Sequence, residues 1–120
     1  MRRDALESML ADALGAPPPR EETPDGEAFF LPLCEASGGS LAPVCQLTDG
    51  RLSAIWFWVQ RLPSGRRDAT EQRALLFACL GRDDPARGEP RAVVLEYKSA
   101  RAMIATEPRA GDAVLRISYR

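Results

Sequence analysis

Two segments of the chain place their apolar residues on one face of a helix. Within residues 4–14 the apolar positions recur at helical spacing, at Leu6, Met9, Leu10, Ala13 and Leu14. Residues 69–80 have a similar stripe, made of Leu75, Leu76, Cys79 and Leu80. A glycine follows each segment, at Gly15 and Gly81, and a capping-box-like pair, Asp68 and Glu71, begins the second. The pattern predicts two helices.

Alternating apolar and polar positions occupy most of the remaining chain and predict strands. The expected strands are residues 27–35, 41–48, 51–61, 92–97 and 113–119, with 102–106 able to pair back as a sixth. Asp49-Gly50 predicts a type I′ turn between the second and third strands. Pro32 predicts an edge or a bulge in the first strand, and Pro43 weakens the second.

These elements follow the order α-β-β-β-α-β-β-β, and strands joined by short turns pair antiparallel. We therefore predict an α+β fold in which two helices pack on an antiparallel sheet of five to six strands. The Pro-rich, charged segment 16–26 is predicted to be an extended linker after the first helix. The length of 120 residues fits a single domain over residues 1–120.

The strand at 51–61 contains the longest apolar run of the chain, over residues 54–59. Side chains alternate between the two faces of a strand, so Ile55, Phe57 and Val59 share one face, and Trp56 and Trp58 share the other. Sheets in small domains commonly have one face on the core and one in water. A strand that is apolar on both faces predicts that a helix, a second subunit or a partner protein covers the tryptophans.

Composition and charge mainly exclude classes of partner. The chain is 45% hydrophobic and 28% charged, which is typical of a soluble domain, and its formal net charge is −1. That balance gives no overall attraction to nucleic acid or to an anionic membrane, so neither is expected as a partner. Asp4, Glu7 and Asp12 interrupt any signal-peptide core near the start.

Histidine is absent. Its absence removes the usual general base near neutral pH and excludes Ser-His-Asp and Cys-His catalysis within this chain. The three cysteines lack the spacing of a metal or redox motif and are predicted to be reduced, buried thiols: Cys34, Cys45 and Cys79. We therefore expect a cytoplasmic protein that is not an enzyme and binds no metal or cofactor.

Charged clusters offer weaker candidates. Glu21-Glu22 and Asp83-Asp84 lie in predicted loops, and neighbouring carboxylates diverge, so both pairs are interpreted as solvated loop charge. Four arginines around the start of the second helix could form a basic patch, namely Arg61, Arg66, Arg67 and Arg73. Phosphate binding there is disfavoured because Asp68 and Glu71 would repel an anion at the helix N-terminus.

Several interpretations of the tryptophan strand remain, and an enzyme that uses Asp, Glu or Cys chemistry ranks last among the functions. Trp56 and Trp58 can form the centre of a protein interface, since tryptophan is enriched at interface hot spots, or they can lie in the core of the protomer. They can also line a small-ligand pocket, with Tyr97, Gln60 and Arg116 as polar groups. An inhibitor of a larger protein would use the same surface as an interface. We favour a non-catalytic protein-binding module.

The opening residues 6–17, which end in Leu14-Gly15-Ala16-Pro17, resemble the class I chaperones of type III secretion, the CesT-like family. The segment 75–80 is similar to the second helix of that family, and the order of elements is similar over about residues 4–106. The resemblance implies a bacterial cytoplasmic homodimer that binds an extended segment of a client protein. It also implies that apolar patches on the first helix, at Leu6, Leu10 and Leu14, join the sheet as client surface.

Overall fold

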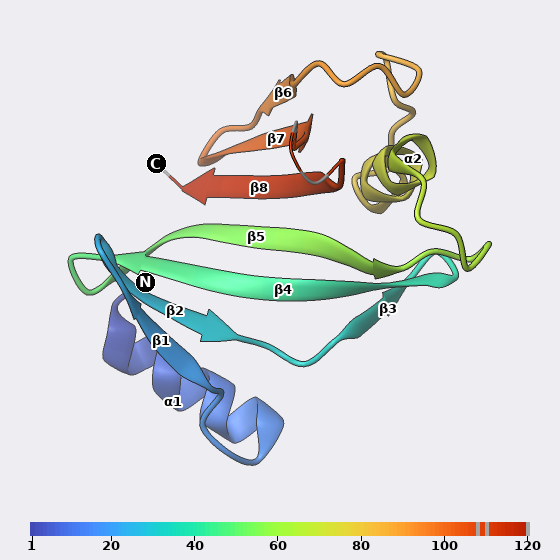
Figure 1. The fold of residues 1–120 in the computed structure, drawn as a ribbon. Coiled ribbons are helices and arrows are strands. Elements are labelled where there is room, and N and C mark those ends of the chain that lie inside the picture. Colours follow the sequence, from blue (N-terminus) through green and yellow to red (C-terminus); the bar gives the residue numbers. More distant parts are fainter. Residues whose placement is uncertain (108, 110, 120) are drawn as a thin grey trace.

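The computed structural model describes residues 1–107, 109 and 111–119, and these form two helices and eight strands (Figure 1). The helices are α1 (Arg3–Leu14) and α2 (Ala69–Cys79). The strands are β1 (Arg20–Thr23), β2 (Gly26–Phe30), β3 (Cys34–Ala36), β4 (Gly39–Thr48), β5 (Arg51–Arg61), β6 (Val93–Glu96), β7 (Ala100–Thr106) and β8 (Ala113–Tyr119). The α+β class and the antiparallel sheet are confirmed. The predicted count of five to six strands and the order of elements are wrong, because two more strands precede α2.

The two unpredicted strands come from the region before residue 37. The expected linker contains β1, whose polar residues are held in a strand by pairing with β2 rather than by burial. The expected strand at 27–35 is divided into β2 and β3, with a break at Leu31, Pro32 and Leu33. Proline has no N–H to donate to a neighbouring strand, which explains the break at this position.

The strands form one sheet in the order β1-β2-β4-β5-β8-β7-β6, with β3 beside β2 on the same edge of β4. Every neighbouring pair is antiparallel. Pro43 lies inside β4, and its carbonyl oxygen accepts a hydrogen bond from the Leu31 N–H at 3.1 Å. The N–H and C=O of a residue in an antiparallel strand point to the same side. Proline has no N–H, so the hydrogen bond that Pro43 cannot donate would have been on the side of the break between β2 and β3.

The long hairpin of β4 and β5 forms the middle of the sheet. Asp49 and Gly50 connect the strands with positive φ angles of 52° and 74°, which confirms the type I′ turn. Further along, Leu47 pairs with Leu52 and Gln46 with Ala54, so Ser53 has no residue opposite it. This β-bulge shifts the pairing of the rest of the hairpin by one residue.

The helix ends are as the sequence predicts, with one exception. Gly15 and Gly81 have left-handed φ angles of 79° and 69° and end the helices. The Asp68 side chain accepts a hydrogen bond from the Thr70 N–H at 2.9 Å. Glu71 does not complete a capping box, because its carboxylate accepts a hydrogen bond from the Ser64 hydroxyl instead.

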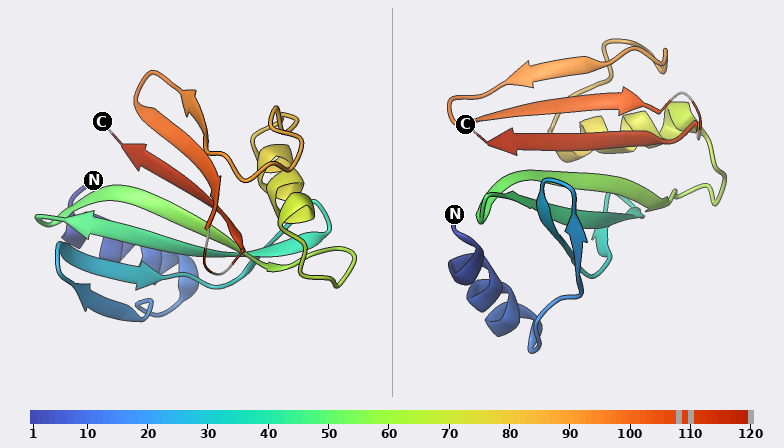
Figure 2. Two further views of the ribbon diagram at one scale, coloured as in Figure 1. Left: turned by 45° about the horizontal axis from the view of Figure 1, so that its top comes forward. Right: turned by 60° about the vertical axis from the view of Figure 1, so that its left-hand side comes forward.

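Both helices pack on the same face of the sheet. The cluster under α1 consists of Leu6, Leu10, Phe29, Cys45 and Leu47. The cluster under α2 includes Leu75, Leu76, Phe77, Leu41, Val59, Ile104 and Leu115. Leu41 and Cys45 belong to different clusters yet are an even number of positions apart on β4, so both clusters lie on one face. Figure 2 shows α1 at the β2 end of the twisted sheet and α2 at the β8 end.

A membrane-spanning helix is not found in the part of the chain that the structure describes, since neither α1 nor α2 has the length and hydrophobicity to cross a bilayer.

A buried ion pair connects α2 to the loop that precedes β6. Arg73 is fully buried and donates hydrogen bonds from Nε and Nη2 to the Asp84 carboxylate, at 2.9 and 3.3 Å. Asp84 also accepts hydrogen bonds from the backbone N–H groups of Ala86 and Gly88. The interpretation of Asp84 as solvated loop charge is therefore wrong, because a buried guanidinium requires an anionic partner.

These contacts predict that stability depends on the charge of Asp84. The hydrogen bond from Arg73, followed by those from Ala86 and Gly88, lowers the pKa of Asp84 below its ordinary value of 3.8. Asp84→Asn leaves Arg73 buried without an anion, so we expect it to lower the free energy of unfolding by about 3–5 kcal/mol at neutral pH. Because the folded-state pKa is depressed, this stabilisation is present above the ordinary value and is lost as the pH falls through the folded-state value.

Urea unfolding followed by circular dichroism at several pH values measures both effects. Asp83→Asn is the matched control, since Asp83 is the exposed neighbour. Equal stability of the two variants at neutral pH would contradict the structural role of the Arg73–Asp84 pair.

Candidate functional site

The face opposite the two helices carries both tryptophans, and we call it the open face. Its side chains come from strands β2, β4, β5, β8, β7 and β6, and follow from the strand register: Ala28, Phe30, Ala42, Val44, Gln46, Ala54, Trp56, Trp58, Val114, Arg116, Ser118, Arg101, Met103, Ala105, Val94 and Glu96. Among the described residues, α1 and α2 both lie on the other side. The sequence-based assignment of Trp56 and Trp58 to the face opposite Ile55, Phe57 and Val59 agrees with this arrangement.

Directly opposed residues form one continuous row across six strands of the open face. The row, which we call the central row, runs Phe30, Val44, Trp56, Arg116, Met103 and Val94. Its two ends are well exposed, Phe30 at 39% and Val94 at 47%. Cross-strand neighbours of this kind lie close enough to contact one another. The central row is therefore an almost entirely apolar strip with one cation near its middle.

Trp56 is fixed in orientation by two polar contacts. Its indole Nε1–H donates a hydrogen bond to the Gln46 Oε1 atom at 2.8 Å. The guanidinium carbon of Arg116 lies 5.0 Å from the centre of the indole ring, within the range of a cation–π interaction. The Nε atom of Arg116 is buried and has no hydrogen-bond partner among the described residues. The ring is half-buried, so part of it stays accessible.

Trp58 is the second half-buried tryptophan of the open face. It lies between Ala42 on β4 and Val114 on β8, two side chains much smaller than its own. The protomer thus shelters neither indole completely. Tryptophan in such a position buries a large apolar area when another molecule covers it.

The three leucines of α1 have different environments. Leu6 and Leu10 are only 2% and 9% exposed, and they pack inside the protomer against Phe29 and its neighbours. Leu14 is 41% exposed. It lines an apolar groove of about 380 Å³ with Ala16, Pro17, Pro18, Pro19, Phe30, Leu31 and Pro32. The structure therefore separates Leu6 and Leu10 from Trp56 and Trp58, and it connects Leu14 to the open face through Phe30.

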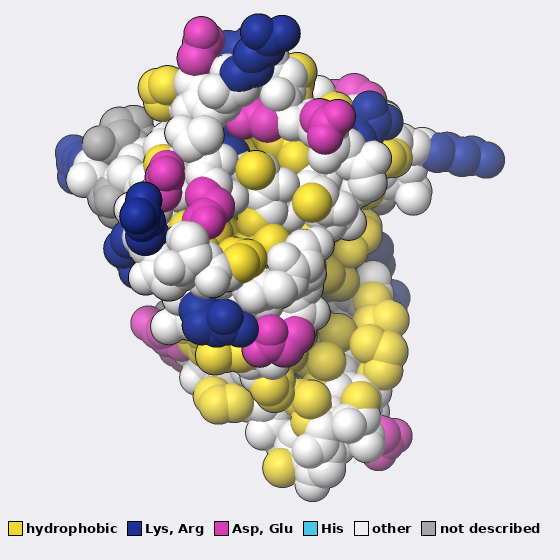
Figure 3. Space-filling model, turned by 90° about the vertical axis from the view of Figure 1, so that its right-hand side faces the viewer, with side chains coloured by type: hydrophobic (Ala, Val, Ile, Leu, Met, Phe, Trp, Pro, Cys, Tyr) yellow, Lys and Arg dark blue, Asp and Glu magenta, His cyan; other side chains and the backbone are white. Residues whose placement is uncertain are grey.

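The hydrophobic surface is visible from the side of the molecule. Figure 3 shows hydrophobic side chains gathered in the lower half of that view, at the height of α1 and β2 in Figure 1. Within α1, β2 and the segment that follows β2, the large exposed hydrophobic residues are Met9, Leu14, Phe30 and Leu33. Clustered exposure of this kind marks interaction surfaces more often than scattered single residues do.

The hollow on the open face lies at the C-terminal strands. It has a volume of about 400 Å³ and is lined by Val94, Arg101, Met103, Arg116, Ser118 and Tyr119. Of the polar groups proposed from sequence for a ligand pocket, the structure brings Arg116 to this hollow. Gln60 lies at the far end of β5 and Tyr97 follows β6, and neither lines it.

The cysteines differ from the sequence-based expectation. Cys45 is buried as predicted, whereas Cys34 and Cys79 are exposed, so the prediction of three core thiols is wrong. Both lie at element ends, at the start of β3 and at the last residue of α2, where the sheet and helix no longer cover them. Burial raises the pKa of Cys45, and burial followed by the neighbouring Cys34 thiol raises the pKa of Cys79. A raised thiol pKa opposes nucleophilic reactivity.

The charged side chains considered from sequence lie in separate contacts in the described residues. No three His, Cys, Asp or Glu side chains within residues 1–107, 109 and 111–119 gather closely enough to hold a metal ion. Three of the four arginines around α2 have a carboxylate partner: Arg61 with Glu35, Arg67 with Asp112, and Arg73 with Asp84. The hydrogen bond from Arg67, followed by that from Gln72, lowers the pKa of Asp112. The basic patch considered from sequence is therefore divided among separate ion pairs.

Comparison with models of protein families, with curated proteins and with solved structures found no match.

The accessibility of the three thiols tests the packing of α1 on the sheet. We expect a thiol-specific reagent to label Cys34 and Cys79 in the native protein and Cys45 only after unfolding, since Cys45 is 3% exposed. Mass spectrometry of the labelled peptides measures each site separately. Variants with Cys34→Ser and Cys79→Ser serve as controls, and native labelling of all three thiols at one rate would contradict the packing of α1 on the sheet.

Proposed function

We propose that this chain is a non-catalytic protein-binding module that holds a partner protein on its open face. The observation that carries the proposal is that α1 and α2 pack on one face of the sheet, while Trp56 and Trp58 stand half-buried on the other. Large aromatic side chains at the centre of an apolar surface are typical hot spots of protein interfaces. Covering them removes apolar surface from water, which favours association.

The geometry of the central row supports binding by a prepared surface. Gln46 and Arg116 hold the Trp56 ring in place before any partner arrives. A side chain that is already ordered loses less conformational entropy when it is buried. The row also crosses six strands, so an extended segment can lie across several of them.

Three kinds of protein function fit an apolar sheet face: a chaperone, an adaptor and an inhibitor. A client protein in an extended conformation fits the resemblance to secretion chaperones, and an adaptor would use the same contacts. An inhibitor of a larger protein would also use this surface and is distinguished by a folded target. We further propose a cytoplasmic location, which the two exposed free thiols support, because exposed thiols persist in reducing compartments.

A small-ligand-binding regulator is the second candidate. The hollow over Arg101 and Arg116 favours it, since a concave site with a few placed polar groups is typical of ligand sites. A small molecule that copurifies with the protein, detected by native mass spectrometry, would support this candidate.

The protein-binding proposal predicts that Trp58→Glu abolishes partner binding and preserves the fold. A charge at this position opposes desolvation of the open face, so we expect binding to weaken by at least about 2 kcal/mol. Affinity purification from the native host with quantitative mass spectrometry measures which proteins are lost. Met9→Glu is the matched control, because Met9 is 48% exposed on α1, on the side of the sheet opposite the open face. Equal partners for wild type and Trp58→Glu would refute the proposed surface.

We also propose that two copies associate. Sedimentation equilibrium is then expected to give twice the chain mass of 13.1 kDa, and Leu14→Asp is expected to change that mass if the apolar groove contributes. A single chain mass at all concentrations would exclude the homodimer and leave the open face to a different protein.

A further inference from the structure

We propose that the hollow beside Trp56 binds the carboxylate of an aspartate or glutamate side chain carried by an apolar segment of the partner protein. This inference rests on the proposed protein-binding function and names the chemistry of the partner. Arg116 and Arg101 would recognise the negative charge of the partner, which the apolar tryptophan rings cannot do.

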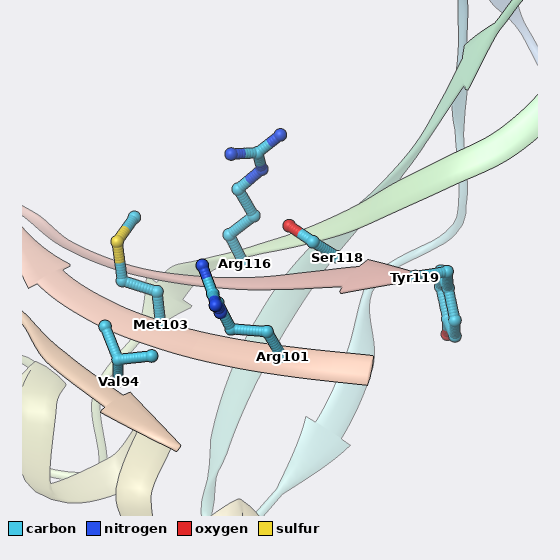
Figure 4. Close-up of a pocket in the computed structure, with 6 residues that line it drawn as sticks. All are labelled: Val94, Arg101, Met103, Arg116, Ser118 and Tyr119. Carbon is cyan, nitrogen blue, oxygen red and sulfur yellow. The ribbon is translucent and has the colours of Figure 1, made fainter. Parts of the chain in front are cut away.

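The hollow presents two cations and a hydroxyl group beside apolar side chains. Figure 4 shows Val94, Arg101, Met103, Arg116 and Ser118 rising from β6, β7 and β8 on one side of the sheet, whereas Tyr119 lies at the end of β8 and points away from that side. The volume of about 400 Å³ accommodates a side chain together with part of its neighbours. A carboxylate entering the hollow would meet both guanidinium groups and the Ser118 hydroxyl.

Arg116 is prepared to receive an anion. Its guanidinium is held over the Trp56 ring, and its Nε atom is buried with no hydrogen-bond partner among the described residues. A buried donor without a partner is costly, so an acceptor that reaches it gains more than an ordinary surface hydrogen bond. The planar guanidinium matches the two oxygens of a carboxylate and can bind them together.

The local charge balance favours one carboxylate. Arg101 already donates a hydrogen bond to Glu96 at 2.7 Å. Arg101 and Arg116 are the charged residues among the described side chains that line the hollow, and with Glu96, the partner of Arg101, these three carry one excess positive charge. A single anionic side chain would neutralise it.

The surroundings favour a protein over a nucleic acid. Binding to a nucleic-acid backbone requires several cations along its path, whereas the central row has one, and the chain has a net charge of −1. Trp56 presents one side of its ring to Arg116, so that side is not available for a base. The neighbours Met103 and Val94 match apolar residues that flank an acidic one.

The experiment selects peptides from a random displayed library with the full-length protein. We expect Asp or Glu to be enriched next to apolar residues. A selected peptide with capped ends is then synthesised beside its counterpart in which the acid is replaced by its amide. Binding of both is measured by calorimetry to wild type, Arg116→Gln and Arg101→Gln, with Arg82→Gln as the matched control. Arg82 is an exposed arginine in the loop after α2.

The amide peptide is expected to bind wild type and Arg82→Gln about 10- to 100-fold more weakly than the acid peptide, as for other charge-assisted hydrogen bonds. Arg116→Gln should bind both peptides alike, because the coupling between the two charges is lost. Arg101 is exposed, so Arg101→Gln gives a second measurement if Arg116→Gln unfolds, and it is expected to reduce the difference between the two peptides.

Selected peptides without acidic enrichment, or equal binding of acid and amide peptides, would overturn the carboxylate site and leave protein binding intact. Failure to select any peptide would overturn the carboxylate site, and the affinity purification with Trp58→Glu would then decide the protein-binding function separately. Displacement of the peptide by acetate or inorganic phosphate alone at equal affinity, or tighter binding of an oligothymidylate, would also overturn the site, since the hollow would then serve a free anion or a nucleic acid.

Discussion

The pairing of β5 with β8 is the contact on which the rest of the structure depends. It joins the strands before α2 to the strands after it, and it places Trp56 opposite Arg116 and Phe57 opposite Leu115. These pairs lie on opposite faces of the sheet. One strand contact therefore completes the core beneath α2 and, at the same time, brings the cation to the tryptophan on the open face.

The packing of both helices on one face gives the two faces of the sheet different roles. The alternate residues of β4 and β5 that face the helices complete two apolar clusters, one under each helix. The intervening residues belong to the open face, where Trp56 and Trp58 retain partial exposure. The same two strands thus contribute to the core with one set of alternate side chains and to the proposed binding surface with the other set.

The buried pair of Arg73 and Asp84 extends this arrangement to the edge of the sheet. The Asp84 carboxylate accepts hydrogen bonds from the backbone N–H groups of Ala86 and Gly88 in the loop after α2, and this loop leads into β6. Burying an ion pair gives little net stability, but losing one partner is costly, so such pairs specify a conformation more than they stabilise it. The loop leads into β6, where Val94 forms one end of the central row.

Short-range rules determined much of this protein from its sequence alone. Helical spacing with terminal glycines gave α1 and α2 nearly to the residue, and Asp49-Gly50 gave the hairpin, because these features depend on neighbouring residues. The same period of two placed Trp56 and Trp58 on one face. Tertiary structure decided the rest. An unbroken hairpin register would set Trp56 opposite Pro43, and the bulge at Ser53 sets it opposite Val44. β1 is a strand because β2 pairs with it, and Arg116 reaches Trp56 because β8 pairs with β5. These outcomes depend on contacts between residues far apart in the chain, which no local pattern encodes.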